Sequence, residues 1–329
     1  KALWDMAEDA KTSLLGIARR YQFDPDYQVG QLTPMHKARW EHVAQKEVDH
    51  LRSQYDYAKI EYLDREQMSE ALGSRRYFGG SRDRGTGHIH PMKYVIGLAA
   101  AAQKSGATLH ENTKALSIRK NGKVTVSTPS GTITAERCLY AMNGYHDDAH
   151  PRLSSHVMPI QSFIASTVPL AADTDVIPNG EAVDDSRFVV RYFRKSRDNR
   201  LLFGGREAYG KPNSGDIFRQ IRNQINEVYP QLSDVELTHA WGGNVAITMP
   251  RLPYIRELEP GVWTAGGFSG HGVMMANYSG RLIAERFLGK SDQIRLLQDL
   301  KIRPFPGGRL FRHPLKILAL TWFAMLDRL

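Results

Sequence analysis

A glycine-rich turn separates a strand-like run from a helix-like run late in the chain. Four glycines, a serine and a histidine fall within the seven residues from Gly266 to Gly272. The short, partly β-branched run at 262–265 predicts a buried strand, and the run after Gly272 predicts a helix. The free N–H groups and positive dipole end of that helix would favour an electron-rich group, which glycine allows to approach closely. From the spacing alone, a tight turn without any ligand explains the segment equally well.

The helix expected after this turn carries its small and apolar residues at helical spacing. The face that this spacing predicts to be buried consists of Val273, Ala276, Gly280, Ile283 and Phe287. Charged residues fall on the other faces. Gly289 follows the last apolar position and is a plausible stop signal.

Two histidines form a second cluster, which is considered as a metal site. His88 and His90 are separated by one residue, so on a strand they would face the same side. A metal site would need a third ligand, and none lies nearby in the sequence. His90 is therefore interpreted as a polar wall of a pocket.

Helices and turns are expected to position these residues. Apolar periodicity predicts four helices in the first third of the chain: residues 2–20, 34–57, 68–73, and a helix that opens at Pro91 and ends before Gly106. Residues 79–91, rich in glycine and charge, predict a loop or a domain crossing. The pairs Asn121-Gly122 and Ser130-Gly131 predict the turns of a β-meander, and the strand "RCLYAM" follows it. This order indicates a parallel sheet with a small antiparallel insertion.

The middle of the chain has a different pattern of apolar and polar residues. Residues 158–170 and 187–205 alternate as long strands do, and the second stretch is interrupted by a polar turn at 196–199. An amphipathic helix is predicted from residue 214. Residues 151–238 therefore read as a separate antiparallel-sheet domain within a mixed α/β protein.

Composition restricts the function. The chain has 329 residues, a formal net charge of +9 and a hydrophobic content of 41%. The basic residues are scattered, which argues against nucleic-acid binding. The single cysteine, Cys138, excludes a disulfide framework and favours a reducing, cytoplasmic location. No apolar segment reaches 18 residues, and the apolar run at 315–325 is expected to cap a core rather than contact a membrane.

Several stretches together resemble one family. They are "GHIHPMKYVIGLA" (87–99), "AMNGY" (141–145), "MPIQSFI" (158–164), "YFRKSRDNRLLFGG" (192–205), "WGGNVAITMPRLPYI" (241–255), "GGFSGHGV" (266–273) and "PFPGGR" (304–309). In this order they resemble the D-amino-acid-oxidase-like (glycine/sarcosine oxidase) superfamily of FAD-dependent amine oxidoreductases. The likeness covers nearly the whole chain and is strongest to members that oxidise γ-glutamylputrescine.

The resemblance implies FAD as the cofactor and an incomplete Rossmann-like FAD-binding domain interleaved with an antiparallel-sheet substrate domain. Its expected parts are 1–84 (mainly substrate domain), 85–150 (FAD-binding), 151–238 (substrate) and 239–329 (FAD-binding, with the C-terminal tail). Beside the isoalloxazine ring it places Gly266, Gly267, Phe268, Ser269, Gly270, His271, Gly272, Val273 and Met274. It also places Asn143 and Gly144 against the cofactor, and Ala115 beside the adenine.

One departure from the family stands out. No G-x-G-x-x-G fingerprint for the FAD pyrophosphate occurs anywhere in the chain. The chain begins with Lys1, and the likeness starts about a hundred residues into the family's usual length. The sequence is therefore expected to be a truncated remainder of a longer enzyme, with a naturally headless chain as the alternative. As written, it is expected to bind FAD poorly and to be inactive alone.

The substrate is inferred from two further departures. Val245 stands where glycine-oxidase-like members have an arginine for the substrate carboxylate, and Met274 where sarcosine-oxidase-like members have a lysine. Because a buried carboxylate needs a cationic partner, an amine or polyamine derivative fits better than an α-amino acid. The pocket candidates are His90, Tyr192, Arg194, Trp241 and Asn244. Arg194 could bind a carboxylate remote from the amine, such as that of a γ-glutamyl group, or could be a solvated hairpin arginine.

The expected reaction is hydride transfer from the carbon beside a neutral amine nitrogen to FAD. The resulting imine would hydrolyse, and oxygen or another electron acceptor would regenerate the flavin. No catalytic residue is assigned, and a homo-oligomer is possible. Two alternatives stay open: a flavin-free remnant acting as a binding or assembly subunit, and an oxidoreductase for another amino-acid-like or opine-like amine.

Overall fold

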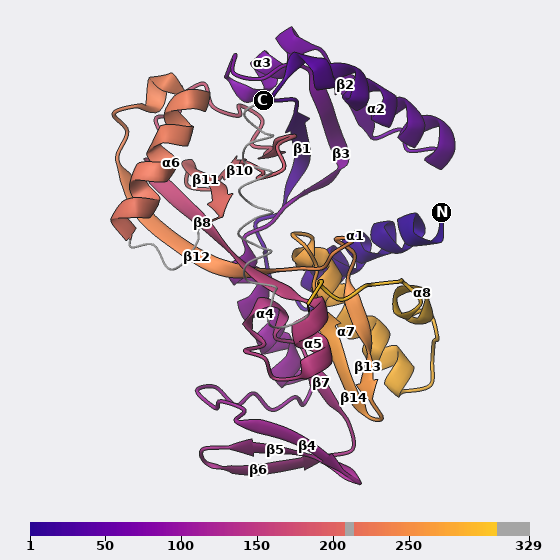
Figure 1. Cartoon of the computed structure of the whole chain (residues 1–329). Coiled ribbons are helices and arrows are strands. Elements are labelled where there is room, and N and C mark those ends of the chain that lie inside the picture. Colours follow the sequence, from indigo (N-terminus) through magenta and orange to yellow (C-terminus); the bar gives the residue numbers. More distant parts are fainter. Residues whose placement is uncertain (208–213, 308–329) are drawn as a thin grey trace. The chain divides into compact units, whose positions relative to one another are not determined.

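The computed structural model describes residues 1–207 and 214–307 (Figure 1). The apolar run at 315–325 lies outside these residues. By their contacts, the described residues divide into two units. The first unit contains Lys1–Phe23, Val95–Ile160 and residues 244–307. The second contains Asp24–Tyr94 and Gln161–Gly243, apart from 208–213.

The second unit is built on a large mixed sheet. In the described part of the chain its strand order is β12-β8-β11-β10-β9-β1-β3-β2. Its strands are β1 (Gln28–Pro34), β2 (Ile60–Leu63), β3 (Gly80–His88), β8 (Met158–Pro169), β9 (Ala182–Asp184), β10 (Tyr192–Lys195), β11 (Arg200–Glu207) and β12 (Leu237–Ile247). β1 and β9 are parallel, whereas β1–β3, β2–β3, β9–β10, β10–β11 and β8–β11 are antiparallel. The turn predicted at 196–199 joins β10 to β11 as expected.

Helices cover this sheet and bury its core. They are α2 (Glu41–Tyr55), α3 (Arg65–Leu72) and α6 (Ser214–Val228), with short 3-10 turns at Ala38–Trp40 and Pro230–Leu232. From α6, Ile221 and Ile225 pack in one cluster with Phe203 of β11 and Phe193 of β10, whose rings stack with centroids 4.8 Å apart. This burial of apolar surface is the main stabilising contribution to the unit.

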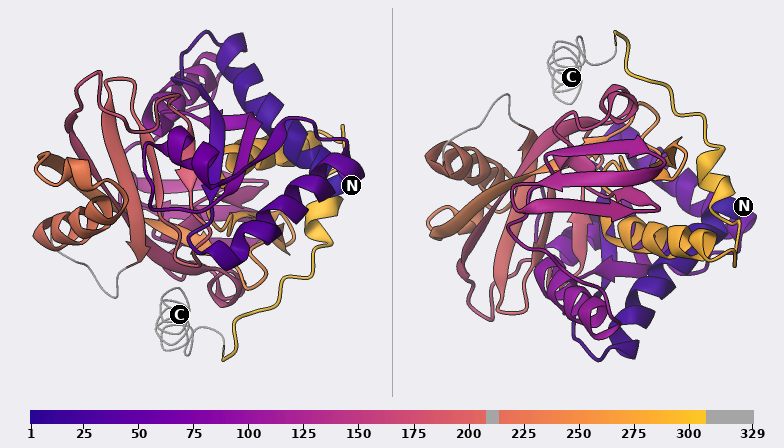
Figure 2. Two further views of the ribbon diagram at one scale, coloured as in Figure 1. Left: turned by 90° about the horizontal axis from the view of Figure 1, so that it is seen from above. Right: turned by 90° about the horizontal axis from the view of Figure 1, so that it is seen from below.

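The first unit contains two three-stranded sheets among its described residues. One has the order β13-β14-β7, in which β14 and β7 are parallel; the other is the predicted antiparallel meander β4-β5-β6, visible as adjacent strands in Figure 2. The bounds are β4 (Ser117–Asn121), β5 (Lys123–Thr128), β6 (Gly131–Ala135), β7 (Cys138–Tyr140), β13 (Tyr254–Glu259) and β14 (Val262–Gly266). The mixture of helices and sheets that the sequence predicts is confirmed.

The helices of the first unit are α1 (Ala2–Arg20), α5 (Pro151–His156), α7 (Gly272–Phe287) and α8 (Arg295–Gln298), with a 3-10 turn at Asn143–Tyr145. Helix α4 (Pro91–Lys104) and strands β8 and β12 have residues in both units. α1 belongs to the first unit, whereas the sequence analysis places residues 1–84 mainly in the substrate domain. Within the described ranges, no helix combines the length and the apolar character needed to cross a bilayer.

The prediction of a loop at 79–91 is wrong, because residues 80–88 form β3 between β1 and β2. Its glycines are explained by close backbone approach rather than by chain reversal. A Cβ at Gly80 would lie 2.3 Å from the Thr33 carbonyl oxygen, and one at Gly87 would lie 2.1 Å from the Gln28 carbonyl oxygen. β1 also has a bulge at Gly30, where φ is +104°.

The helix after the glycine turn is confirmed, but its predicted buried face is largely wrong. Val273, Ala276 and Gly280 are exposed. The buried residues of α7 are Met275, Tyr278, Ser279, Leu282 and Ile283. α1 packs against α7 and contributes Met6 and Ala10 to the same cluster, so tertiary packing decides which side is covered.

Replacing Gly80 by alanine is expected to lower the free energy of unfolding by about 1–3 kcal/mol, because the new methyl group overpacks the β1–β3 contact. Gly16→Ala is the matched control. That position lies inside α1 with nothing within 4 Å of a built Cβ, so helix propensity should raise stability by about 0.5–1 kcal/mol. Urea unfolding followed by circular dichroism measures both. Equal stability of Gly80→Ala and the parent chain would contradict the close-approach explanation.

Candidate functional site

The glycine turn between β14 and α7 has a left-handed backbone. Gly267, Ser269 and Gly270 have φ values of +65°, +52° and +102°. A side chain at Gly270 would be strained although no atom lies within 4 Å of a built Cβ. The turn is therefore open to a neighbouring molecule at Gly270, and its glycine content follows from its backbone conformation.

Hydrogen bonds hold this turn to the rest of the first unit. The Ser269 N–H donates to the Ala246 carbonyl oxygen at 2.8 Å, and the Thr248 N–H donates to Ser269 Oγ at 3.3 Å. The Gly267 N–H donates to Asn143 Oδ1 at 3.1 Å. Asn143, expected from the resemblance to lie against the cofactor, thus contacts the glycine turn itself. The contacts of Ala246 and Thr248 were not predicted, because a backbone carbonyl and an ordinary threonine carry no recognisable signal.

The N-terminus of α7 presents unpaired donors. Its N-cap residue, His271, makes no side-chain capping bond, and the first bond into the helix runs from the Met275 N–H to the His271 carbonyl oxygen at 3.4 Å. The N–H groups of Gly272, Val273 and Met274 therefore have no acceptor among the described residues. Val273 is 51% exposed. These donors, together with the helix dipole, can stabilise an electron-rich group.

Other predicted cofactor residues occupy different environments. The Phe268 side chain is only 5% exposed and packs with Trp263 and Met275 in the core, so only its backbone remains available. Gly144 is buried beneath Asn244, which lies in the first unit and not with the other pocket candidates.

Asn244 is instead part of the network beside this turn. Its Nδ2 donates to the Gly144 carbonyl oxygen at 3.2 Å, and its N–H donates to the Tyr145 hydroxyl at 2.9 Å. Ala115 is exposed next to β4, in a different sheet from β14.

The second unit contains a cavity of about 580 Å³. It is lined by four of the five predicted pocket residues: His90, Tyr192, Arg194 and Trp241. The remaining lining residues are Pro91, Met92, Ile164, Ser166, Ala182, Val183, Phe193, Ser196, Asp198, Arg200, Leu202 and Gly204. A cavity of this size with largely apolar walls and a few charged groups is typical of a small-molecule site.

Gly204 explains the position of the Tyr192 ring. The two residues face each other across β10 and β11, and a Cβ at Gly204 would lie 2.3 Å from the tyrosine ring. The glycine thus leaves room for the ring to lie over the strand. The Tyr192 hydroxyl is 2.8 Å from Ser162 Oγ, which fixes the ring further.

Arg194 is half-buried at this cavity and has no carboxylate within ion-pair distance in the described part of the chain. Among the described residues, its guanidinium makes one long hydrogen bond, 3.4 Å to the Lys195 carbonyl oxygen. Burial lowers the pKa of Arg194, although nearby Asp26 opposes this shift. An arginine remains protonated even so, and the wall of the cavity therefore contains a cation with no carboxylate at ion-pair distance among the described residues.

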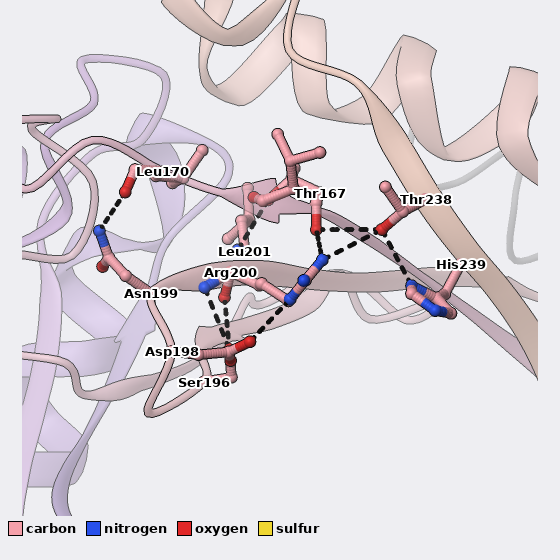
Figure 3. Close-up of polar contacts among 10 residues, drawn as sticks. Thr167, Leu170, Ser196, Asp198, Asn199, Arg200, Leu201, Thr238 and His239 are labelled. Atoms are coloured by element: carbon pink, nitrogen blue, oxygen red, sulfur yellow. Dashed lines mark hydrogen bonds and ion pairs between the residues drawn. The ribbon is translucent and has the colours of Figure 1, made fainter.

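Arg200 on the adjacent strand shows the opposite arrangement. Its Nε donates to Asp198 at 2.7 Å, and its guanidinium also donates to the Thr167 carbonyl oxygen at 3.0 Å and to the Thr238 hydroxyl at 3.2 Å. Figure 3 shows the side chain extended between these partners, so that it ties β8 and β12 to the β10–β11 turn. The Arg200 side chain is therefore held by partners within the protein, whereas the Arg194 guanidinium is available to a ligand.

Two other kinds of site, a metal centre and a reactive cysteine, find no support among the described residues. No group of three or more His, Cys, Asp or Glu side chains in the described ranges is arranged to hold a metal ion. Cys138 is half-buried, and burial raises the pKa of its thiol, which makes it a poor nucleophile.

Comparisons with known proteins assign the family. The model of the family described as "FAD dependent oxidoreductase" (DAO) matches residues 1–286. The chain is 55% identical to the "Probable oxidoreductase OrdL" of Rhizobium meliloti (strain 1021), over 99% of this chain and 76% of that one. It is 32% identical to the "Gamma-glutamylputrescine oxidoreductase" of Escherichia coli (strain K12), over 94% and 74%.

Among solved structures, glycine oxidase from Geobacillus kaustophilus has a TM-score of 0.77 at 19% identity, covering 88% of this chain and 80% of that one. L-Proline dehydrogenase from P. horikoshii has a TM-score of 0.73 at 19% identity, covering 88% and 79%. These structural likenesses concern the fold, whereas the family match and the closer relatives concern the activity. The resemblance inferred from the motifs is thereby confirmed, and the chain belongs to the DAO family of FAD-dependent oxidoreductases.

Proposed function

We propose that this enzyme oxidises an amine whose far end carries a carboxylate, as a γ-glutamyl derivative of a diamine does. The observation that carries the proposal is Arg194, a cation at the wall of the large cavity with no carboxylate at ion-pair distance among the described residues. A carboxylate is the natural partner of a half-buried guanidinium, because it can accept two parallel hydrogen bonds. The 32% identity to a protein named gamma-glutamylputrescine oxidoreductase supports the same substrate class.

The residues at the glycine turn fit a flavin. The unpaired N–H groups of Gly272, Val273 and Met274 stand at the positive end of α7, and Gly270 leaves open space beside them. FAD, when bound, supplies the acceptor for a hydride and gains negative charge near N1 of its ring as it does so. We assign these donors to the N1/C2-carbonyl side of the ring, where they would stabilise that charge.

This assignment gives each unit a role. The first unit, with the glycine turn, Asn143 and Gly144, would hold FAD. The second, with its large sheet and cavity, would bind the substrate. The roles therefore alternate along the chain, because each unit is assembled from separate segments.

Two uncharged side chains support an amine as the substrate rather than an α-amino acid. Val245 lies on β12, and Met274 packs partly against the apolar cluster that α7 shares with α1. Neither side chain offers a cation to a carboxylate beside the reacting carbon. Arg194 would instead bind a carboxylate at the other end of the substrate. Tyr192 and Trp241 would form walls that orient the chain between the two ends.

The reaction then follows from the chemistry of amines. The carbon next to the nitrogen loses a hydride, the nitrogen lone pair completes a C=N bond, and water adds to the imine to give an aldehyde and ammonia. Oxygen or another acceptor takes up the two electrons.

Arg194→Met is expected to lower kcat/KM for a carboxylate-bearing monoacylated diamine by about 10- to 100-fold, because it removes charge-assisted hydrogen bonds. It should leave kcat/KM for the same diamine acylated with a neutral group nearly unchanged. The control is Arg75→Met, which removes an exposed arginine outside the large cavity. Peroxide release or dye reduction by the FAD-loaded protein measures the rates. An equal loss for both substrates would contradict the role of Arg194.

Val273→Asp is expected to lower the midpoint potential of bound FAD by about 10–20 mV, because a negative charge at the start of α7 opposes the charge of the reduced ring. Val273→Asn is the uncharged control of the same size. The aspartate should not destabilise the fold, since an acid favours a helix N-terminus. Reductive titration followed by flavin absorbance gives the potential. Identical potentials in the two variants would place the ring away from α7.

A further inference from the structure

One face of the sheet in the second unit forms the floor of the large cavity. On β8, Ile164 and Ser166 line the cavity, whereas Ala165 between them belongs to the apolar core on the opposite face. The lining crosses neighbouring strands, from Ala182 on β9 through β10, β11 and β8 to Trp241 on β12. A ligand that fills the cavity therefore extends across the strands rather than along one of them.

Ser166 places a hydroxyl on this floor for which the described residues supply no partner. The residue is only 4% exposed, and its hydroxyl makes no hydrogen bond within the described part of the chain. Two other hydroxyls of β8 are paired: Ser162 Oγ lies 2.8 Å from the Tyr192 hydroxyl, and Thr167 Oγ1 donates to the Val168 carbonyl oxygen at 2.6 Å. Because a buried hydroxyl without a partner is unfavourable, a ligand that supplies one is bound more strongly.

The residues beside Ser166 on the floor offer no free charge. Leu202 lies directly opposite on β11, and Ile164 precedes it on the same face of β8. Arg200, two residues before Leu202, is already paired with Asp198. A charged ligand group at this place would lose hydration without gaining a counter-ion, and an apolar group would leave the hydroxyl unpaired. A neutral hydrogen-bonding group satisfies both conditions.

Ser166 and Arg194 lie in one row across the sheet. Leu202 pairs with Ser166 of β8 on one side and with Arg194 of β10 on the other, so the three side chains share the cavity face. Two strand spacings, about 10 Å, separate the backbones of Ser166 and Arg194. A substrate whose carboxylate lies at Arg194 and whose chain extends toward Trp241 therefore passes Ser166 with its middle part.

We propose that Ser166 determines specificity by hydrogen bonding to a neutral polar group in the middle of the substrate, between the carboxylate and the oxidised C–N bond. In a monoacylated diamine this group is the amide, whose carbonyl oxygen accepts from the Ser166 hydroxyl. The inference rests on the proposed function and deepens it, because it assigns recognition of the linking group to one side chain. Arg194 alone would not distinguish an acylated diamine from an amine with a plain alkyl chain.

The test uses two carboxylate-bearing amines of equal chain length. One is 1,4-diaminobutane acylated by glutarate, and the other is 10-aminodecanoate, in which methylenes replace the amide. For the FAD-loaded protein, Ser166→Ala should lower kcat/KM for the amide compound by about ten-fold, mainly through KM. It should change kcat/KM for 10-aminodecanoate by less than about two-fold. Ser53→Ala, which removes an exposed hydroxyl outside the large cavity, should change neither.

Two measurements without turnover separate recognition from folding. In calorimetric titrations, Ser166→Ala should weaken the binding of N-butylglutaramate, which keeps the amide but lacks the amine, and should leave the binding of decanoate unchanged. The free energy of unfolding should not fall, because the substitution removes a hydroxyl that has no partner among the described residues.

An equal change for the amide and the alkyl compounds, in rate and in binding, would overturn the role of Ser166. The proposed function would still stand in that case if Arg194→Met lowers kcat/KM for both amines, since both carry the carboxylate. If the parent protein neither binds nor oxidises either amine, the proposed function and the role of Ser166 both fall.

Discussion

The hydrogen bond from the Ser269 N–H to the Ala246 carbonyl oxygen connects the strand β12 to the turn before α7. It holds a left-handed residue in place, and the turn that it fixes decides where the first N–H groups of α7 point. Those donors are useful to a cofactor only if they are left unpaired and held in position beforehand, because reorganisation during the reaction would cost part of the stabilisation. His271, which makes no side-chain capping bond, leaves the donors unpaired, and two hydrogen bonds hold the turn: Asn143 Oδ1 accepts from the Gly267 N–H, and the Thr248 N–H donates to Ser269 Oγ.

Charge pairing distinguishes the arginines of the β10–β11 hairpin. Arg197 and Arg200 each contact carboxylates, and both serve to hold the turn and its neighbours together. Arg194 is half-buried without such a contact, which is costly unless a ligand supplies the missing charge. Similar residues on one hairpin therefore have different tasks, and only their surroundings reveal which one is available.

Much of the fold could be predicted from the chain because its signals are local. The meander turns at Asn121-Gly122 and Ser130-Gly131, the start of α4 at Pro91 and the strand–turn–helix around Gly266–Gly272 all depend on neighbouring residues. The prediction failed where contacts with distant segments of the chain determine the local structure or the buried face. β3 has the composition of a loop, but its glycines accommodate the backbone of β1, and the buried side of α7 is set by α1. The pocket candidates Tyr192 and Arg194 on β10 came from the resemblance, and both line the large cavity. The ion pairs of Arg197 with Asp24 and Asp26 were not predicted, because the partners lie more than 170 residues apart in the sequence.

The residues that line the large cavity also influence the protonation of the substrate amine. An amine can lose a hydride from its neighbouring carbon only while its nitrogen lone pair is free. Pro91, Met92 and Ile164 offer no polar side chain to an ammonium group, and the carboxylate of Asp198 is already paired with Arg200. In the proposed complex, desolvation among such residues lowers the pKa of the substrate amine, since burial disfavours the charged form. The carboxylate at the far end keeps its charge because Arg194 compensates it. A single cavity can in this way bind one end of the molecule as an ion and prepare the other end as a neutral amine.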